Sequence, residues 1–196
     1  MQYPLLASLA FSTVMPAIFV TAELLRTFAP FSRSRYWLRL DPGRVGLIAL
    51  SVAGLVLLIL SLAFPRFLFP FVWIGLFLAL DPLNALLGHP SLTAQVREGR
   101  WDTVLVLFAA GLICGWFWEL WNVFSMPKWV YDVPFVGSPK LFEMPVLGYG
   151  GYLPFALEVF AAWSLLHGTL LGRNRGWVRF TRPYEAYPEP QPGRGG

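Results

Sequence analysis

Two glutamates inside long apolar stretches are the residues most able to do chemistry in this chain. Glu119 stands in GWFWELWN and Glu158 in LPFALEVF. An ionisable group within a membrane segment is energetically expensive, so it usually faces the interior of a helix bundle and often marks a functional site. A carboxyl group in an apolar site favours its neutral form and can then donate a proton. We therefore predict that Glu119 and Glu158 are catalytic acids.

The residues around Glu119 indicate that its helix packs closely on another one. In a helix, Asn122 shares the face of Glu119, and Gly111 and Gly115 extend that face backward in a GxxxG pattern. Small residues at this spacing let two helices approach each other closely. Glu119 is therefore expected to point into the bundle, with Asn122 as a third catalytic candidate. The alternative is a structural role, in which hydrogen bonds from neighbouring side chains satisfy each glutamate.

Aromatic side chains are dense around Glu119 and in the segment that follows it. Tryptophan faces can stabilise a carbocation, and segment 125–144 adds a tyrosine, lysines and a glutamate. The predicted substrate-binding residues are Trp116, Trp118, Trp121, Trp129, Tyr131, Lys140 and Glu143. The alternative for the tryptophans is an aromatic belt at the membrane interface.

The composition places these residues in a membrane protein. Of the 196 residues, 56% are hydrophobic and 13% are charged, whereas a soluble domain has about 25% charged residues. That balance excludes an ordinary soluble domain and also disorder, which requires low hydrophobicity. One cysteine and two distant histidines supply no disulfide framework and no zinc motif, and no nucleotide-binding motif is present. We therefore predict neither a metal nor a cofactor.

Five segments are apolar over the length of roughly 20 residues that a bilayer span needs. Backbone groups in lipid must pair internally, so each segment is expected to be a helix. We predict an all-α, polytopic transmembrane helix bundle with about five spans, at residues 4–25, 45–64, 67–87, 103–124 and 145–171. The short connection FPRFLFP predicts that spans two and three are antiparallel neighbours. Asp81, in LDPLN, is expected to cap a turn after a helix break at Pro82.

The basic residues predict the orientation. With five spans, the loops 26–44 and 88–102 and the C-terminal tail share one side and carry twelve arginines, whereas the other side carries Arg66, Lys128 and Lys140. Because basic residues concentrate in cytoplasmic loops, we predict the N-terminus outside and the C-terminus in the cytoplasm. The protein is then a multi-pass protein of the bacterial inner (plasma) membrane. Its net charge of +4 suits anionic lipid headgroups, so the lipid bilayer, and not nucleic acid, is the expected partner.

We predict one domain and a tail. Residues 1–182 form the transmembrane bundle, and residues 183–196 form a tail rich in proline and glycine. Segment 125–144, SMPKWVYDVPFVGSPKLFEM, is aromatic and apolar, so it is expected to fold back over the outer face of the bundle. Whether this segment acts as a lid is left open.

The stretch 116–158 resembles a pattern in small bacterial membrane proteins and, more distantly, two families that act on carotenoids. A run similar to the G-x-K-L-F-G-V-P run of membrane carotenoid hydratases consists of Gly137, Lys140, Leu141, Phe142 and Pro145, with Glu143 in place of a glycine. A pattern similar to that of lycopene cyclase domains consists of Trp118, Glu119, Trp129, Tyr131 and Pro145. The Glu-Glu pair of the cyclase domains is missing here.

This resemblance implies proton-initiated, non-redox chemistry on an isoprenoid chain. Glu119 or Glu158 would be the acid, and the tryptophans with Tyr131 would form the aromatic walls of the site. Two other classes stay open at this point. The chain can be a non-catalytic subunit or assembly factor with partner subunits in a larger membrane complex, or a small transporter or proton path that uses Glu158.

Overall fold

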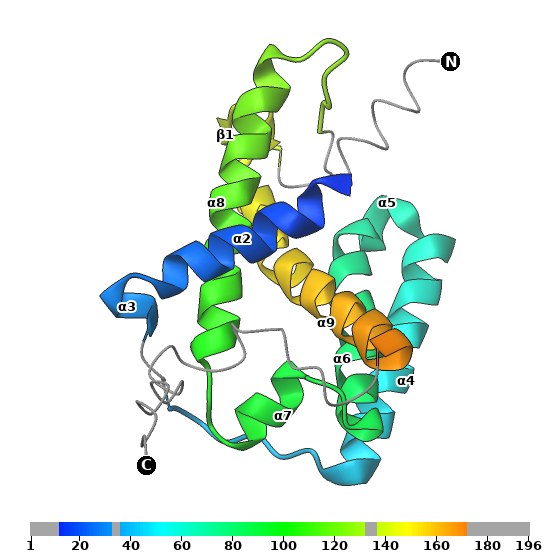
Figure 1. Ribbon diagram of the computed structural model, residues 1–196. Helices are drawn as coiled ribbons and strands as arrows, with labels where there is room; N and C mark the ends of the chain where they lie inside the picture. The colour runs from blue at the N-terminus through cyan, green and yellow to red at the C-terminus, as the bar shows by residue number, and fades with distance from the viewer. Residues whose placement is uncertain (1–11, 33–35, 132–136, 172–196) are drawn as a thin grey trace, which may run out of the picture.

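The computed structural model describes residues 12–32, 36–131 and 137–171 as a bundle of helices with one short hairpin (Figure 1). The longer helices are α2 (Val14–Arg26), α4 (Gly43–Ala63), α6 (Val72–Leu87), α8 (Asp102–Phe124) and α9 (Tyr152–Leu171). The shorter elements are α3 (Ala29–Ser32), α5 (Pro65–Leu68), η1 (Phe69–Phe71), α7 (Leu92–Arg97), β1 (Lys140–Leu141), β2 (Met144–Pro145) and η2 (Val146–Gly151). The predicted all-α class is confirmed. The predicted tail, residues 183–196, lies outside the described residues.

Four helical segments within the described part of the chain are long and apolar enough to cross a membrane. They are Gly43–Ala63, Pro65–Leu87, Asp102–Phe124 and Val146–Leu170. Each agrees with one of the predicted spans to within two residues at either end. Helices of this length and composition are those of a membrane protein.

The first predicted span, residues 4–25, is described only in part. Residues 4–11 lie outside the described residues, and α2 has 13 residues. A helix of that length covers about 20 Å, whereas the hydrocarbon core of a bilayer is about 30 Å thick. In Figure 1, α2 runs obliquely across α8. The count of five spans therefore stays a prediction.

A buried charge pair attaches α2 to the first turn of α8. The Arg26 guanidinium donates to the Asp102 carboxylate at 3.0 Å and to the Thr103 hydroxyl at 3.0 Å. Arg26 is 6% exposed and Asp102 is 2% exposed. A buried charge that loses its partner is strongly destabilising, so this pair holds α2 in one register on α8.

The helices α4 and α6 are neighbours, as the short FPRFLFP connection predicts, and α5 and η1 form the turn between them (Figure 1). Their backbones approach closely at Gly54. A Cβ atom at Gly54 would lie 2.3 Å from the backbone nitrogen of Ala79 and 2.7 Å from the carbonyl oxygen of Gly75. Only glycine fits at this crossing without moving a backbone.

The predicted helix break at Pro82 is wrong, because α6 continues through Pro82 to Leu87. Proline removes one backbone hydrogen bond, which membrane helices tolerate when their surroundings compensate. The fully buried Asp81 carboxylate does not cap the next turn of its own helix. It accepts hydrogen bonds from the backbone N–H groups of Leu92 at 2.8 Å and Thr93 at 2.7 Å. Asp81 therefore anchors the first turn of α7 to α6.

Residues 36–42 and 88–101 pack together at one end of the bundle, which we call the basic end. The Trp37 N–H donates to the Gly99 carbonyl at 2.8 Å, and the Trp101 indole donates to the Leu38 carbonyl at 2.8 Å. The opposite end, which we call the loop end, holds the described residues 125–131 and 137–151 (Figure 1). The two described arginine-rich connections thus lie at the same end of the molecule.

The α4–α6 crossing supplies a test of the fold. We predict that Gly54→Ala lowers the free energy of unfolding by about 1–3 kcal/mol, because the added Cβ overlaps the α6 backbone. Thermal unfolding of the purified protein in detergent measures the loss. Gly150→Ala is the matched control, since a Cβ at Gly150 meets nothing within 4 Å. Equal unfolding midpoints for the two variants would contradict the close crossing.

Candidate functional site

Glu119 is buried near the loop end of α8, with 1% of its surface exposed, and two tyrosines hold its carboxyl group. Its Oε1 atom accepts hydrogen bonds from the hydroxyls of Tyr131 and Tyr152, each at 2.7 Å. Its Oε2 atom is buried and has no hydrogen-bond partner among the described residues. One oxygen is therefore doubly hydrogen-bonded, while the other is free to hold or receive a proton.

The close approach of α8 and α9 brings Tyr152 to Glu119. A Cβ atom at Gly111 would lie 2.5 Å from the carbonyl oxygen of Tyr152, and one at Gly115 would lie 2.3 Å from the Tyr152 ring. Gly115 precedes Glu119 by one helical turn on the same face. The Tyr152 ring therefore packs directly on the backbone of Gly115, and its hydroxyl reaches the Glu119 carboxyl group. The predicted close helix contact is confirmed, and its partner is the first turn of α9.

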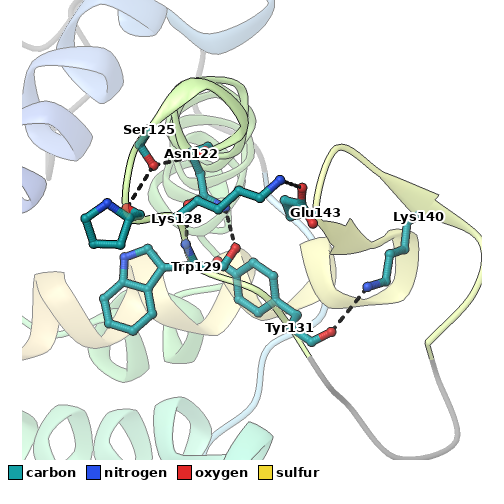
Figure 2. A network of polar contacts seen from close by, with 8 residues as sticks. Asn122, Ser125, Lys128, Trp129, Tyr131, Lys140 and Glu143 are labelled. Atoms are coloured by element: carbon teal, nitrogen blue, oxygen red, sulfur yellow. Dashed lines mark hydrogen bonds and ion pairs between the residues drawn. The ribbon is translucent and has the colours of Figure 1, made fainter.

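Asn122 holds the segment that follows α8. Its amide nitrogen donates to the Trp129 carbonyl at 2.8 Å, and its Oδ1 accepts the Trp129 N–H at 2.7 Å (Figure 2). The Ser125 hydroxyl donates to the Asn122 carbonyl at 2.9 Å. The two hydrogen bonds between Asn122 and Trp129 turn the chain back toward α8, and Tyr131, two residues further on, then reaches Glu119. Asn122, predicted as catalytic, has a positioning role in these contacts.

Two lysines brace the same segment. Lys128 forms an ion pair with Glu143, and the Lys140 ammonium donates to the Tyr131 carbonyl at 3.3 Å (Figure 2). The strands β1 and β2 form an antiparallel hairpin that carries Lys140 and the turn containing Glu143. The predicted binding residues Lys140 and Glu143 thus join the hairpin to residues 128–131.

The predicted tryptophans divide into one beside the site and three with much of their surface exposed. The ring centroids of Trp118 and Tyr152 are 5.9 Å apart. Trp116 is 40% exposed, and Trp121 and Trp129 are 62% and 58% exposed. Trp118 is placed to line a site at Glu119, whereas the other three have the exposure typical of an interfacial belt.

Glu158 is buried in α9 but does not share the tyrosines of Glu119. It lies six residues beyond Tyr152, which is about 9 Å along the helix and roughly 120° around it. Its surface is 7% exposed, and its Oε2 atom has no hydrogen-bond partner among the described residues. The structure therefore groups Glu119 with Tyr131 and Tyr152, and places Glu158 on a different face of α9.

The face of α9 that carries Glu158 is turned toward α6. On one side of Glu158 along the helix, Phe155 contacts Trp73 of α6 with ring centroids 5.6 Å apart. On the other side, the Asn84 amide of α6 donates to the Ala161 carbonyl at 2.8 Å. Glu158 lies between these two contacts and faces the α6–α9 interface.

Tyr131 keeps its proton in this arrangement. Burial raises the pKa of the Tyr131 phenol, and its hydrogen bond to Glu119 raises that pKa further. The ordinary pKa of tyrosine is already about 10, so the phenol is protonated at neutral pH. Tyr131 is therefore a hydrogen-bond donor to Glu119 throughout the physiological range.

Tyr152 is the site residue that the sequence analysis missed. It stands in LGYGGYLPF, and no spacing within that motif relates it to Glu119. The indirect signal was Gly115, whose missing side chain leaves room for a bulky group one turn from the acid. Among the described residues, no three His, Cys, Asp or Glu side chains gather closely enough to hold a metal ion.

No protein-family model, curated protein or solved structure gives a significant match to this chain. The resemblance to carotenoid hydratases and lycopene cyclase domains therefore stays a hypothesis.

The Asn122 contact supplies a test of the site. We predict that Asn122→Leu speeds hydrogen exchange at the Trp129 amide by up to about tenfold, because one hydrogen bond contributes roughly 0.5–1.5 kcal/mol. Exchange measured by mass spectrometry on peptides that cover 126–131 reports the change. Leu147→Ala, an exposed change at the same end, is the control. Unchanged protection of Trp129 in the Asn122 variant would contradict the assigned role.

Proposed function

We propose that this chain is an integral membrane enzyme that performs non-redox acid–base chemistry on an apolar, lipid-dissolved substrate of the isoprenoid class. One observation carries the proposal. The Glu119 carboxyl group has two phenol donors on Oε1, while the buried Oε2 has no partner among the described residues. Buried structural carboxylates usually have both oxygens paired, so a single unpaired oxygen favours a role in proton transfer.

In the proposed reaction, Glu119 transfers a proton from Oε2 to one carbon of a C=C bond. The π electrons of the alkene form the new C–H bond, the second carbon becomes a carbocation, and Glu119 becomes a carboxylate. The two phenol hydrogen bonds stabilise that negative charge, and the face of Trp118 stabilises the cation. Returning a proton to Glu119 yields a shifted double bond. Capture of water instead yields an alcohol and releases the proton that restores Glu119.

The segment 125–131 is proposed to cover this acid and to move when substrate enters. Tyr131 reaches Glu119 from outside the four candidate spans, and the bonds between Asn122 and Trp129 fold the segment over the end of α8. A cover of this kind would exclude bulk water from the site, so that solvent does not trap the carbocation indiscriminately.

The proposed location is the bacterial inner membrane, with the loop end outside and the basic end in the cytoplasm. The excess of arginines at the basic end supports this orientation whether the chain has four spans or five. Residues 1–25 contain no Lys or Arg, so the side on which they lie does not alter the balance of basic residues. Adding or removing a first span changes only the side on which the N-terminus lies.

A second candidate function, a proton path through Glu158, is favoured by other buried polar atoms near α9. The Oδ1 atom of Asn84 and the Nδ1 atom of His89 are buried without a hydrogen-bond partner among the described residues. A Cβ at Gly168 would lie 2.5 Å from the His89 ring, which places His89 against α9 nearer the basic end. Buried polar groups of this kind commonly bind water, and water can relay protons.

The enzyme proposal predicts a specific loss. Glu119→Gln should abolish product formation in a carotenoid-producing host, because an amide cannot supply the proton. Tyr131→Phe and Tyr152→Phe should each lower the rate about tenfold or more, since each removes a hydrogen bond to the developing carboxylate. Pigment analysis of cells with matched protein levels measures both effects. Glu23→Gln, on the exposed side of α2, is the control.

An unchanged pigment profile in the Glu119 variant, at wild-type protein level, would remove the proposed chemistry. Loss of product in the Glu158→Gln variant alone would transfer the role of acid to Glu158.

The proton-path candidate has its own measurement. We predict that Glu158→Gln abolishes proton flux into liposomes that contain the purified protein, while Glu119→Gln leaves that flux unchanged. A pH-sensitive dye inside the liposomes records the flux. Equal flux in wild-type and Glu158→Gln liposomes would reject this candidate and leave the enzyme proposal untouched.

A further inference from the structure

The basic end contains a cavity of about 470 Å³, which is large enough for a small ligand. Its walls come from α4, α6, α7, α8 and α9, and α7 lies between the ends of α8 and α6 in Figure 1. Phe108 is the lining residue of α8 nearest to Glu119 in the chain, and it precedes Glu119 by 11 residues, which is about 16 Å along the helix. The cavity is therefore separate from the proposed acid site.

The interior of this cavity suits a hydrocarbon chain. Among its lining residues are Leu50, Phe77, Val96, Val104, Phe108 and Leu157. Two further lining residues, Asp41 and Thr93, are polar, but their side chains are engaged. Asp41 pairs with Arg97 at 2.9 Å, and the Thr93 hydroxyl donates to Asp81 at 2.5 Å. The walls thus present apolar surface and no unpaired charge.

Exposure along the lining locates the mouth of the cavity. Val104 and Leu157 are 6% and 7% exposed, whereas Leu40 is 47% exposed. The mouth therefore lies at residues 40–42, within the segment that packs on α7. Trp101 lines the cavity and contacts Trp37, with ring centroids 5.8 Å apart. Tryptophan is enriched at membrane interfaces.

Basic residues adjoin this mouth in the chain. Arg39 and Arg44 stand on either side of residues 40–42 in the chain, and Arg97 pairs with Asp41 at the rim. Among the described ion pairs, neither Arg39 nor Arg44 has an acidic partner. An apolar cavity with two uncompensated arginines next to its mouth in the chain matches an amphiphile with an apolar chain and a negative head.

We infer that this cavity binds one hydrocarbon chain of an anionic phospholipid, with the phosphate of that lipid beside Arg39 and Arg44. Basic pockets between membrane helices recognise anionic lipid headgroups through the charge of the phosphate. Burial of the chain in the cavity supplies the apolar part of the binding free energy. The charge at the rim selects an anionic lipid over a neutral one with the same chains.

Photo-crosslinking tests which molecule occupies the cavity. The protein is produced with benzoylphenylalanine in place of Val96, irradiated in native membranes, and analysed by mass spectrometry. The inference predicts an adduct with the mass of a phospholipid. A crosslink to residues 172–196 of the same chain, to a second copy of the chain, or to another protein would overturn it.

Binding to the delipidated protein in detergent tests the chemistry of recognition. Phosphatidylglycerol should raise the unfolding midpoint more than phosphatidylcholine with the same chains, and glycerol phosphate alone should have no effect. Leu50→Trp fills the cavity and should lower the affinity for phosphatidylglycerol at least tenfold. Leu55→Trp is the matched control, because Leu55 lies on the same helix and is 53% exposed.

Substitution of Arg39 and Arg44 gives a second test, which does not require that the Leu50→Trp variant folds. Arg39→Gln with Arg44→Gln should weaken phosphatidylglycerol binding about fivefold for each arginine removed, and should leave phosphatidylcholine unaffected. Arg66→Gln, at the opposite end, is the charge control. Wild-type affinity in the double variant, or wild-type affinity in a folded Leu50→Trp protein, would overturn the inference.

Discussion

The close approach of α8 and α9 is the contact on which the candidate site depends. Lipid tails are as apolar as leucine, so helices in a membrane associate through backbone packing and interhelical hydrogen bonds rather than through the hydrophobic effect. Tyr152 contributes to both: its ring lies on Gly115 and its hydroxyl binds Glu119. A larger residue than glycine at position 115 would displace the ring and leave a carboxyl group that is 1% exposed with one donor fewer.

The same physics explains how the rest of the bundle is held. Gly54 lets α4 and α6 meet at their backbones, Arg26 pairs with Asp102 to hold α2, and Asp81 binds the first turn of α7. Each of these buried charges has partners on another element, because a charge without a partner in a dry interior is costly. Glu119 also has partners on other elements, but its Oε2 and the Oε2 of Glu158 depart from full pairing, because both are buried with neither a hydrogen bond nor an ion pair among the described residues, whereas the second oxygen of Asp102 lies 3.6 Å from Arg100. That departure favours a functional reading of the two acids.

The two ends of the molecule differ in chemistry. At the loop end, a short segment stabilised by Asn122, Lys128 and Lys140 brings a phenol to a buried carboxyl group. At the basic end, α7 and residues 40–42 border an apolar cavity next to Arg39 and Arg44 in the chain. The first arrangement suits proton transfer and the second suits the retention of a lipid. One helix, α8, contributes residues to both ends.

The sequence by itself determined the class of protein, the position of four helices and the inward direction of Glu119. These follow from span length, from the cost of unpaired backbone groups in lipid and from the spacing of Gly111, Gly115 and Glu119, all of which are local properties. Only the tertiary structure showed that Tyr152 completes the site, that Glu158 faces α6, and that Asp81 binds another helix. Those contacts depend on how helices far apart in sequence are rotated and crossed, and no local spacing encodes that rotation.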